Sequence, residues 1–342
     1  MKAMVLHEVV TMDKTPEPLT PEDLPIPKPR TGEVLIRVRA CGVCHTELDE
    51  IEGRTPPGKL PLVPGHQVVG KVVTTGTGVS LLKPGDRVGV AWIYNACGNC
   101  RYCQSGLENL CGRFEATGRD VDGGYAEYMI AREGFAYPLP EIFSDTEAAP
   151  LLCAGAIGYR SLRLARPDSI ARLGLMGFGA SAHLVLKLVR HRYPNMDVFV
   201  FARNETERSF ALELGAVWSG DITERPPDKP DSIIDTTPAW KPVVASMGHL
   251  AKGGRLVINA IRKEAGDKEY LCNLSYEDHL WMEKELKSVA NITARDVTEF
   301  LELAAEAGIR PHVKTYPLRA ANQALKELRS GEIKGAKVLV MP

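Results

Sequence analysis

The first 90 residues alternate apolar and polar positions over short stretches, which is the two-residue period of half-buried β-strands. The alternation is clearest in the second half of residues 31–40, TGEVLIRVRA. Six prolines between residues 16 and 29 exclude a helix from the connector that precedes this strand. Three further short strands, separated by glycine turns, are predicted over residues 4–10, 68–75 and 85–90. The chain therefore begins with a compact, mostly β domain.

From about residue 150 the pattern changes to apolar strands that alternate with amphipathic helices. An apolar strand at 169–173 runs into glycines and then into a helix. A strand at 197–202 is followed by a helix at 205–214 that ends at Gly215. Together with later strands at 233–237 and 254–259, this pattern predicts a parallel sheet. The last fifty residues predict a helix at 298–307, a strand at 313–316, a helix at 320–329 and a strand at 337–341.

The composition is that of an ordinary globular protein. At 342 residues the chain exceeds the size at which one core usually keeps growing, so two domains are expected. A formal net charge of -1 gives no electrostatic basis for binding nucleic acid or an acidic membrane surface. Polar residues interrupt the N-terminus before a signal-peptide core forms, and no apolar run reaches spanning length. We expect a cytoplasmic protein.

Four of the eight cysteines form a dense cluster in a polar, glycine-containing loop. Four thiolates fill all positions of a tetrahedral site, which is typical of a structural zinc. The alternatives are an iron–sulfur cluster, weakened by the missing Cys-Pro ending, and free or disulfide-paired cysteines. The four predicted ligands are Cys97, Cys100, Cys103 and Cys111.

A second candidate metal site combines a thiol and an imidazole from two short loops, at Cys44 and His66. Thiolate sulfur and imidazole nitrogen are ligands that Zn²⁺ prefers, and a catalytic zinc takes three protein ligands. Cys153 is the candidate third ligand. The alternative is a Cys-x-x-Cys redox pair of Cys41 and Cys44 beside an unrelated histidine. Cys272 belongs to no cluster and is predicted to be a buried small hydrophobe.

The glycines that follow the strand at 169–173 predict a dinucleotide-binding loop. In one register Gly177 and Gly179 are followed by Ala182 in the third glycine's place; in the other, Gly174 and Gly179 flank Met176. In both, the backbone can approach a pyrophosphate, and the next helix offers free N–H groups. The predicted cofactor contacts in this loop are Gly177, Phe178, Gly179, Ala180 and Ser181.

The end of the next strand bears on the choice of cofactor. NAD-binding sheets place an acidic residue there to hold the ribose hydroxyls. This chain has Ala202, Arg203 and Asn204 instead. A missing carboxylate and an added guanidinium favour the 2′-phosphate of NADP(H) over NAD(H). The alternative is that Arg203 is a solvated turn residue.

These motifs, in this order, resemble those of zinc-containing medium-chain alcohol dehydrogenases over nearly the whole chain. They are GVCHT at 42–46, PGH at 64–66, KPGD at 83–86, the four-cysteine loop, APLLCAG at 149–155 and the glycine loop. The resemblance implies a Rossmann doubly wound parallel sheet inserted in a GroES-like, mostly β catalytic domain. The implied segments are 1–148 and 291–342 for the catalytic domain and 149–290 for the Rossmann domain. It also favours the second glycine register.

The resemblance also implies site roles and a mechanism. Cys44, His66 and Cys153 would hold a catalytic zinc, and the four-cysteine loop a structural zinc, so each chain would bind two. An alcohol would bind the open metal position and pass a hydride from its carbinol carbon to the nicotinamide. Thr46 would receive the hydroxyl proton. His45 and Asp49 are the other catalytic candidates, and His45 is also a candidate cofactor contact.

Several residues depart from the family pattern around the metal. Gln67 replaces the glutamate that usually follows the histidine ligand. Glu47 replaces an aspartate that orients this histidine, a tolerable change. Asp49 stands where many members have the histidine that ends the proton relay, so a different pH optimum is expected.

Three further positions concern the cofactor and the substrate. Lys337 is the candidate substitute for an arginine that many relatives direct at the pyrophosphate. Trp92 matches a large aromatic residue of the substrate pocket in microbial relatives. Arg54 replaces an apolar pocket residue; of a role at the pocket mouth and a solvent-directed side chain, we favour the second.

The sequence therefore predicts a zinc-dependent alcohol dehydrogenase or aldehyde reductase that acts on a small alcohol or aldehyde. A polyol or sugar dehydrogenase of the same fold is one alternative. A non-catalytic dinucleotide-binding zinc protein is the other, supported by Gln67 and Asp49 but opposed by the complete open-site ligand set. A homo-oligomer, either a dimer or a tetramer, is expected.

Overall fold

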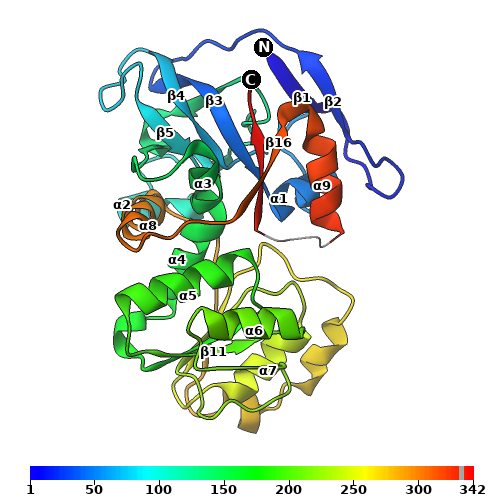
Figure 1. Ribbon diagram of the computed structural model, residues 1–342, viewed down its shortest axis with the longest axis vertical. Helices are drawn as coiled ribbons and strands as arrows, with labels where there is room; N and C mark the ends of the chain where they lie inside the picture. The colour runs from blue at the N-terminus through cyan, green and yellow to red at the C-terminus, as the bar shows by residue number, and fades with distance from the viewer. Residues whose placement is uncertain (331–334) are drawn as a thin grey trace. The chain divides into compact units, whose positions relative to one another are not determined.

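The computed structural model describes residues 1–330 and 335–342 and divides them into two compact units (Figure 1). Unit 1 contains Met1–Cys153 and Ile292–Pro342, and unit 2 contains Ala154–Asn291. Both ends of the chain thus contribute to unit 1. No described helix combines the length and apolar character needed to cross a membrane.

Unit 1 is built on a mostly antiparallel seven-stranded sheet in which β3 (Glu33–Val43) is central. β3 pairs with β4 (Val68–Thr75) on one side and β17 (Ala336–Val340) on the other, although β17 lies about 300 residues later in the chain. The other strands of this sheet are β5 (Arg87–Val90), β8 (Tyr128–Arg132), β9 (Ala136–Pro138) and β16 (Val313–Pro317). The alternation predicted for the strand at 31–40 is seen in its second half, where Val38 and Ala40 are buried and Arg37 and Arg39 are exposed.

Two short antiparallel ribbons, five α-helices and several short 3-10 and π-helical turns complete the described part of unit 1. The expected opening strand ends earlier than predicted, because β1 (Lys2–Leu6) stops before the polar pair at 7–8. It pairs with β2 (Leu19–Asp23), a strand within the proline-rich connector, where Pro21 sits on a sheet edge. The remaining elements are β6 (Ile93–Asn95), β7 (Glu115–Ala116), α1 (His45–Ile51), α2 (Arg101–Gln104), α3 (Asp145–Pro150), α8 (Ala294–Glu306) and α9 (Ala321–Arg329).

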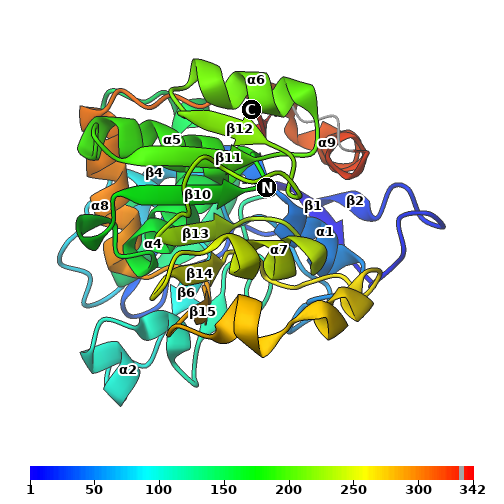
Figure 2. The same cartoon turned by 90° about the horizontal axis from the view of Figure 1, so that it is seen from below.

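Unit 2 has the predicted parallel sheet, and Figure 2 shows its strands side by side in the order β12-β11-β10-β13-β14-β15. All five strand pairs are parallel. The strands are β10 (Arg172–Met176), β11 (Asp197–Phe201), β12 (Trp218–Gly220), β13 (Ser232–Asp235), β14 (Arg255–Ile258) and β15 (Glu285–Ser288). The helices are α4 (Ala156–Leu164), α5 (Ala180–Arg192), α6 (Glu205–Glu213) and α7 (Lys241–His249). The predicted doubly wound fold class is confirmed.

Helix boundaries follow side-chain caps that the periodicity did not reveal. α8 begins four residues before the expected 298, because the Thr293 hydroxyl and the Asp296 carboxylate form a capping box. α6 begins as predicted, after Asn204, whose side chain accepts a hydrogen bond from Glu207 N at 2.8 Å. The helix predicted at 320–329 is α9, and residue 331, expected to follow its end, lies outside the described residues.

Candidate metal centres and nucleotide-binding loop

The four-cysteine loop brings its sulfur atoms together. Among Cys97, Cys100, Cys103 and Cys111, all ligand atoms lie within 4.8 Å of one another. The Cys100–Cys103 and Cys97–Cys103 sulfur distances are 3.6 and 3.9 Å. A zinc tetrahedron with Zn–S bonds of about 2.3 Å has sulfur atoms about 3.8 Å apart. Disulfides need about 2.05 Å, and a multi-iron cluster holds its thiolates farther apart, so a single zinc fits this loop best.

The electrostatics of the loop also suit a cation. Backbone hydrogen bonding at Asn99, followed by the Arg113 side chain, lowers the pKa of Cys97 to about 5. Burial and its cysteine neighbours raise the pKa of Cys103 to about 12. Four thiols this close cannot all ionise without a positive charge between them. A zinc ion at this position would supply that charge and would fix a loop whose regular elements are α2 and a one-turn helix at Glu108–Leu110.

The second cluster consists of Cys44, His66 and Cys153, whose ligand atoms also lie within 4.8 Å of one another. His66 Nε2 lies 3.8 Å from Cys44 Sγ and 3.3 Å from Cys153 Sγ. Cys44 is the N-cap of α1, His66 precedes β4, and Cys153 lies in a single π-helical turn, Leu151–Gly155. Two sulfurs and one nitrogen leave the fourth position of a zinc tetrahedron open, which is the ligand count of a catalytic zinc.

Glu47 connects this cluster to the start of α1. One carboxylate oxygen lies 2.6 Å from His66 Nδ1, and both side chains are almost completely buried. The other oxygen accepts a 2.8 Å hydrogen bond from Cys44 N and so closes a capping box. Burial lowers the pKa of His66, but Glu47 and Cys44 outweigh burial, so the pKa is well above its usual value. With Nδ1 held by Glu47, Nε2 faces the thiols.

Without a cation, ionisation of the Cys44 thiol is unfavourable. The hydrogen bond with the Cys153 side chain, then burial, raises the pKa of Cys44 well above that of a free thiol. A divalent cation would reverse this effect, since thiolates are the metal-bound form. The donor set therefore fits zinc.

Three sequence-predicted residues follow Cys44 on α1, and their environments differ. The Thr46 hydroxyl accepts a 3.3 Å hydrogen bond from Cys44 Sγ and is partly exposed. His45 is exposed. Asp49 is buried, and its Oδ1 accepts a 2.5 Å hydrogen bond from Arg54 Nε. Arg54 is exposed, consistent with the solvent-directed side chain that we favoured, and its guanidinium also pairs with Glu52.

Two residues near the cluster in sequence, Cys41 and Gln67, are buried and are not among its ligands. Cys41 is fully buried in the unit 1 core, where its sulfur lies against Gly65 and Gly124, so it takes no part in the metal cluster. Gln67 is buried too, and its side chain covers Gly42: a Cβ on that glycine would lie 2.5 Å from Gln67 Oε1. The prediction for Cys272 is wrong, because this cysteine is exposed in a 3-10 helix, Lys268–Asn273.

Trp92 is half-buried and its ring lies 5.4 Å from that of Phe114. The buried carboxyl of Glu50 is a neighbour of this indole that was not predicted from the sequence. The signal was the spacing on α1, since Glu50 follows Thr46 by four residues and Glu47 by three, which places the three side chains on one helix face.

In unit 2 the glycine loop connects β10 to α5. Gly177 has φ +83°, and a Cβ there would lie 3.0 Å from Thr236 Oγ1 and Thr237 Cγ2, so both conformation and space favour glycine. Gly179 is the N-cap of α5 and supplies no side-chain cap, which leaves the first N–H groups of the helix for a ligand. Met176 ends β10 and is buried in the unit 2 core, so its side chain is directed away from the loop backbone.

The three residues that follow β11, at 202–204, lie in different environments. Ala202 is buried, Asn204 caps α6, and Arg203 is exposed. A second guanidinium, not predicted from the sequence, lies at the same strand end: Arg208 Nη1 donates a 3.4 Å hydrogen bond to Ala202 O. No carboxylate stands at 202–204.

Lys337, the candidate pyrophosphate contact, is 5% exposed in unit 1. Its ammonium lies 3.4 Å from both Glu327 Oε2 and Tyr316 Oη. It is therefore engaged with a carboxylate of α9, a contact that sequence spacing did not indicate.

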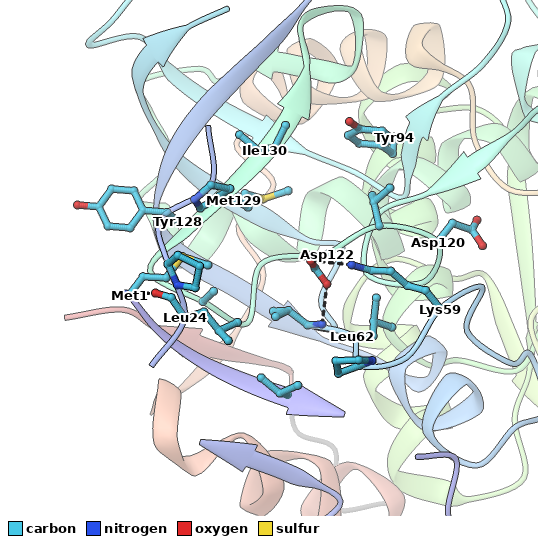
Figure 3. Close-up of a pocket in the computed structure, with 18 of the residues that line it drawn as sticks. Met1, Leu24, Lys59, Leu62, Tyr94, Asp120, Asp122, Tyr128, Met129 and Ile130 are labelled. Atoms are coloured by element: carbon cyan, nitrogen blue, oxygen red, sulfur yellow. Dashed lines mark hydrogen bonds and ion pairs between the residues drawn. The ribbon is translucent and has the colours of Figure 1, made fainter. Parts of the chain in front are cut away.

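A surface pocket of about 830 Å³ lies in unit 1, away from both cysteine clusters (Figure 3). The proline-rich connector and the segments at 59–63 and 120–130 line it. In Figure 3 Asp122 bridges Lys59 and the backbone of Val63, with contacts of 2.7 and 3.0 Å. None of the seven clustered cysteine and histidine ligands belongs to its lining.

Comparison with known proteins gives consistent results. The alcohol dehydrogenase GroES-like domain matches residues 30–141. A probable alcohol dehydrogenase, AdhA, of Mycobacterium tuberculosis (strain CDC 1551 / Oshkosh) is 40% identical over 321 residues, which cover 92% of this chain and 91% of that protein. An alcohol dehydrogenase of Geobacillus stearothermophilus is 32% identical over 99% of both chains.

A solved structure has the same fold over almost the full length. It is a cobalt- and zinc-bound thermostable alcohol dehydrogenase from Pyrobaculum aerophilum, 25% identical, with a TM-score of 0.83 and 99% coverage of both chains.

Proposed function

Because this chain belongs to the zinc-containing medium-chain alcohol dehydrogenase family, we propose that it interconverts a small alcohol and the corresponding aldehyde or ketone, with NADP(H) or NAD(H) as hydride carrier. The observation that carries the proposal is the convergence of Cys44, His66 and Cys153, with Glu47 behind the histidine. A binding protein without catalysis has little use for a ligand set that leaves one position open.

Cys44, His66 and Cys153 would hold the catalytic zinc, which when bound supplies a Lewis acid that favours the alkoxide form of an alcohol. Glu47 keeps the His66 ring oriented for its part in this site. Thr46 is placed to receive the substrate proton, since its hydroxyl lies beside Cys44 Sγ and is partly exposed. We assign the later part of the proton path to Asp49 and His45, with Arg54 setting the charge around Asp49.

Cys97, Cys100, Cys103 and Cys111 would hold a second, structural zinc, giving two per chain. This zinc would stabilise the loop and take no part in the reaction, because all its positions are filled by the protein. Six of the seven candidate ligands are cysteines that must stay reduced to bind zinc, so we propose a cytoplasmic location.

The dinucleotide would lie on the segment Gly177–Ser181, with its pyrophosphate at the N-terminus of α5. We favour NADP(H), because Arg203 and Arg208 gather at a strand end that has no carboxylate at 202–204. Lys337 contributes less than proposed from sequence, since its ammonium is already engaged with Glu327. The buried Phe178 would stabilise the loop by packing against Phe210, with ring centroids 5.9 Å apart.

We also propose a homo-oligomer. β15 is the edge strand of the unit 2 sheet in the described chain, and Leu286 on it and Trp281 just before it are each 52% exposed. An unpaired edge with exposed apolar side chains is a surface that proteins usually cover.

The test of the function combines metal content and turnover. Protein purified without chelator should contain two zinc ions per chain and should reduce NADP⁺ in the presence of primary alcohols. Cys153→Ala should lose one zinc and at least about 100-fold in kcat/KM, a range set by the loss of a metal ligand. One zinc per chain with no turnover of alcohols or aldehydes on either cofactor would instead support a non-catalytic binding protein.

A further inference from the structure

A buried ion pair lies at the carboxyl edge of the unit 2 sheet. Lys263 Nζ lies 2.5 Å from Asp235 Oδ2, and the two side chains are only 7% and 0% exposed. Asp235 is the last residue of β13, and Lys263 follows the neighbouring strand, β14. A buried pair of charges is often no more stabilising than apolar side chains of the same volume, so stability alone does not account for this one.

The ammonium group of Lys263 has three donors, and all three are used. Besides Asp235, it donates to the carbonyl oxygens of Thr237 and Ala239, at 2.7 and 3.1 Å. The other oxygen of Asp235 accepts hydrogen bonds from the backbone N–H and the hydroxyl of Thr237, at 2.9 and 2.7 Å. The pair therefore holds segment 236–239, an irregular stretch that follows β13.

Segment 236–239 lies against the glycine loop. The backbone N–H and the hydroxyl of Thr236 both donate to the carbonyl oxygen of Met176, the last residue of β10, at 2.9 and 3.2 Å. A Cβ on the next residue, Gly177, would lie 3.0 Å from both Thr236 Oγ1 and Thr237 Cγ2. The segment and the loop are thus in direct contact, and the position of one constrains the other.

This contact falls where a doubly wound sheet binds its ligand. β10 and β13 are neighbours, and the later strands are added outward from them on both sides (Figure 2). Ligands of such sheets bind outside the carboxyl ends of the strands at this point of reversal. A dinucleotide on Gly177–Ser181 would therefore lie beside a segment that the buried pair holds in place.

We propose that Asp235 and Lys263 are positioning residues for the dinucleotide: the pair keeps segment 236–239 against the glycine loop and preorganises the pyrophosphate site before the cofactor binds. The inference rests on the proposed function, in which the dinucleotide lies on Gly177–Ser181. Without the pair, binding of the dinucleotide must also order the segment, and this cost lowers the affinity.

The test compares the dissociation constants of NADPH and NADH, measured from the change in their fluorescence on binding. Lys263→Met should raise the Kd of the preferred dinucleotide about tenfold or more, because the carbonyls of segment 236–239 lose their donor. The variant should also lower the apparent Tm, because Asp235 is left buried without its cation. Zinc content should stay as in the wild type, since all seven candidate ligands belong to unit 1. Turnover at saturating dinucleotide should change less than about threefold, so that KM changes rather than kcat.

A double variant separates positioning from stability. Asp235→Asn combined with Lys263→Met removes both buried charges, so most of the lost Tm should return. The amide oxygen can still accept hydrogen bonds from Thr237. The carbonyls of Thr237 and Ala239 nevertheless remain without the ammonium group, so the Kd should stay raised.

Asp231→Ala is the matched control, just before the opposite end of β13. The Asp231 carboxylate accepts hydrogen bonds from Ala171 N and Arg172 N at 3.0 and 2.9 Å and so ties β13 to the start of β10. Its loss should lower the Tm of the protein and leave the Kd of the dinucleotide unchanged.

An unchanged Kd in Lys263→Met would overturn the inference. A double variant in which Tm and Kd recover together would do the same, because that result is expected of a pair with a purely structural role. So would a rise of Kd in Asp231→Ala as large as that in Lys263→Met. In each of these cases, dinucleotide binding and turnover by the wild type would leave the proposed function intact. If Lys263→Met does not fold, the double variant and the control decide the question. If the wild type binds neither NADPH nor NADH, both proposals fail.

Discussion

One oxygen of Glu47 accepts a hydrogen bond from the backbone of Cys44, and the other lies against His66 Nδ1. A single carboxylate therefore fixes the start of α1 and the orientation of a metal ligand. The two tasks can be separated, because a second capping box in unit 1 has the same chemistry without a metal. There Glu147 accepts a 2.9 Å hydrogen bond from Ser144 N at the start of α3.

We predict that Glu47→Gln lowers zinc affinity at the Cys44–His66–Cys153 site by about 10–100-fold, because the amide holds the imidazole less firmly and makes it a weaker donor. Competition with a colorimetric chelator measures this change. Glu147→Gln, the control, should weaken a helix cap and leave both zinc affinities as they are. Equal zinc affinity in the wild type and Glu47→Gln would contradict the assigned role.

Ala202→Asp should shift the cofactor preference toward NAD(H) by about 10-fold or more, because a carboxylate at the end of β11 repels a 2′-phosphate and can hold the ribose hydroxyls. The ratio of kcat/KM for NADPH to that for NADH is the measurement. The control is Leu212→Asp, which adds the same charge at an exposed position on α6 and should not change the ratio. If Ala202→Asp changes the ratio no more than Leu212→Asp does, the end of β11 does not set the cofactor preference.

The sequence predicted which cysteine and histidine residues gather into the two clusters, and the structure brings both sets together. Most of these residues belong to short motifs whose spacing is close to their three-dimensional arrangement. The partners of Arg54 and Lys337 were harder to predict, because a long cationic side chain can reach several carboxylates. The folded structure shows which of them it contacts, here Asp49 and Glu327. Glu50 was missed because its spacing places it on one helix face with Thr46 and Glu47 but does not show that this face is buried.

At the scale of elements, the four-cysteine loop contains only short pieces of regular structure. α2 has four residues and the following 3-10 helix has three. Isolated segments of this length are not stable without an external constraint. We therefore expect the loop to depend on the proposed zinc for its stability.

Cys100→Ser should lose one zinc per chain, lower the apparent Tm, and leave the Cys44–His66–Cys153 site loaded, because the two ligand sets share no residue. Metal analysis and a thermal scan give both readouts. Cys272→Ser, a substitution at an exposed cysteine outside both clusters, should change neither. If Cys100→Ser retains two zinc ions, the loop is not a zinc site of the proposed kind.

Helix α9 is held to β16 and β17 by one carboxylate. Glu327 contacts Lys314 at 2.7 Å, Lys337 at 3.4 Å and the hydroxyl of Tyr316. The hydrogen bond from Lys314, then that from Tyr316, lowers the pKa of Glu327 to about 2.

A carboxyl whose folded pKa is depressed stabilises the protein fully above its ordinary pKa of about 4.5, and this contribution disappears as the pH falls toward about 2. Glu327→Gln should therefore lower the apparent Tm at pH 7, and the difference from the wild type should shrink between pH 5 and pH 3.5. Thermal scans over this range test the sign. A difference that grows on acidification would exclude the assigned pairing.

At the scale of the molecule, periodicity identified the parallel sheet of unit 2, because each of its strands is a short apolar run followed by a helix. It could not give the strand order of unit 1. The pairing of β17 with β3 joins positions 337–340 to 40–43, and no local pattern encodes such a contact. The family resemblance supplied only the expectation that both ends of the chain build one domain, and not the strand pairing itself.

A homo-oligomer that uses the β15 edge should be sensitive to charge there. Leu286→Lys should reduce the mass measured by light scattering to that of a single chain, 37.4 kDa, because a buried lysine at a subunit contact is costly. Leu212→Lys, at a similarly exposed leucine on α6, should keep the mass of the wild type. A wild type that is already monomeric would rule out the oligomer.

The pairing of β3 between β4 and β17 also has a consequence for synthesis. A ribosome releases the whole of unit 2 before it makes β16, α9 and β17. Unit 2 can therefore fold while β3 is paired with β4 and β8 only. Residues 40–43 of β3 then still lack their β17 partner, beside an incomplete core. Translation pauses near residues 292–312 would prolong this exposure, and we expect the nascent chain at that stage to be the form most dependent on chaperones.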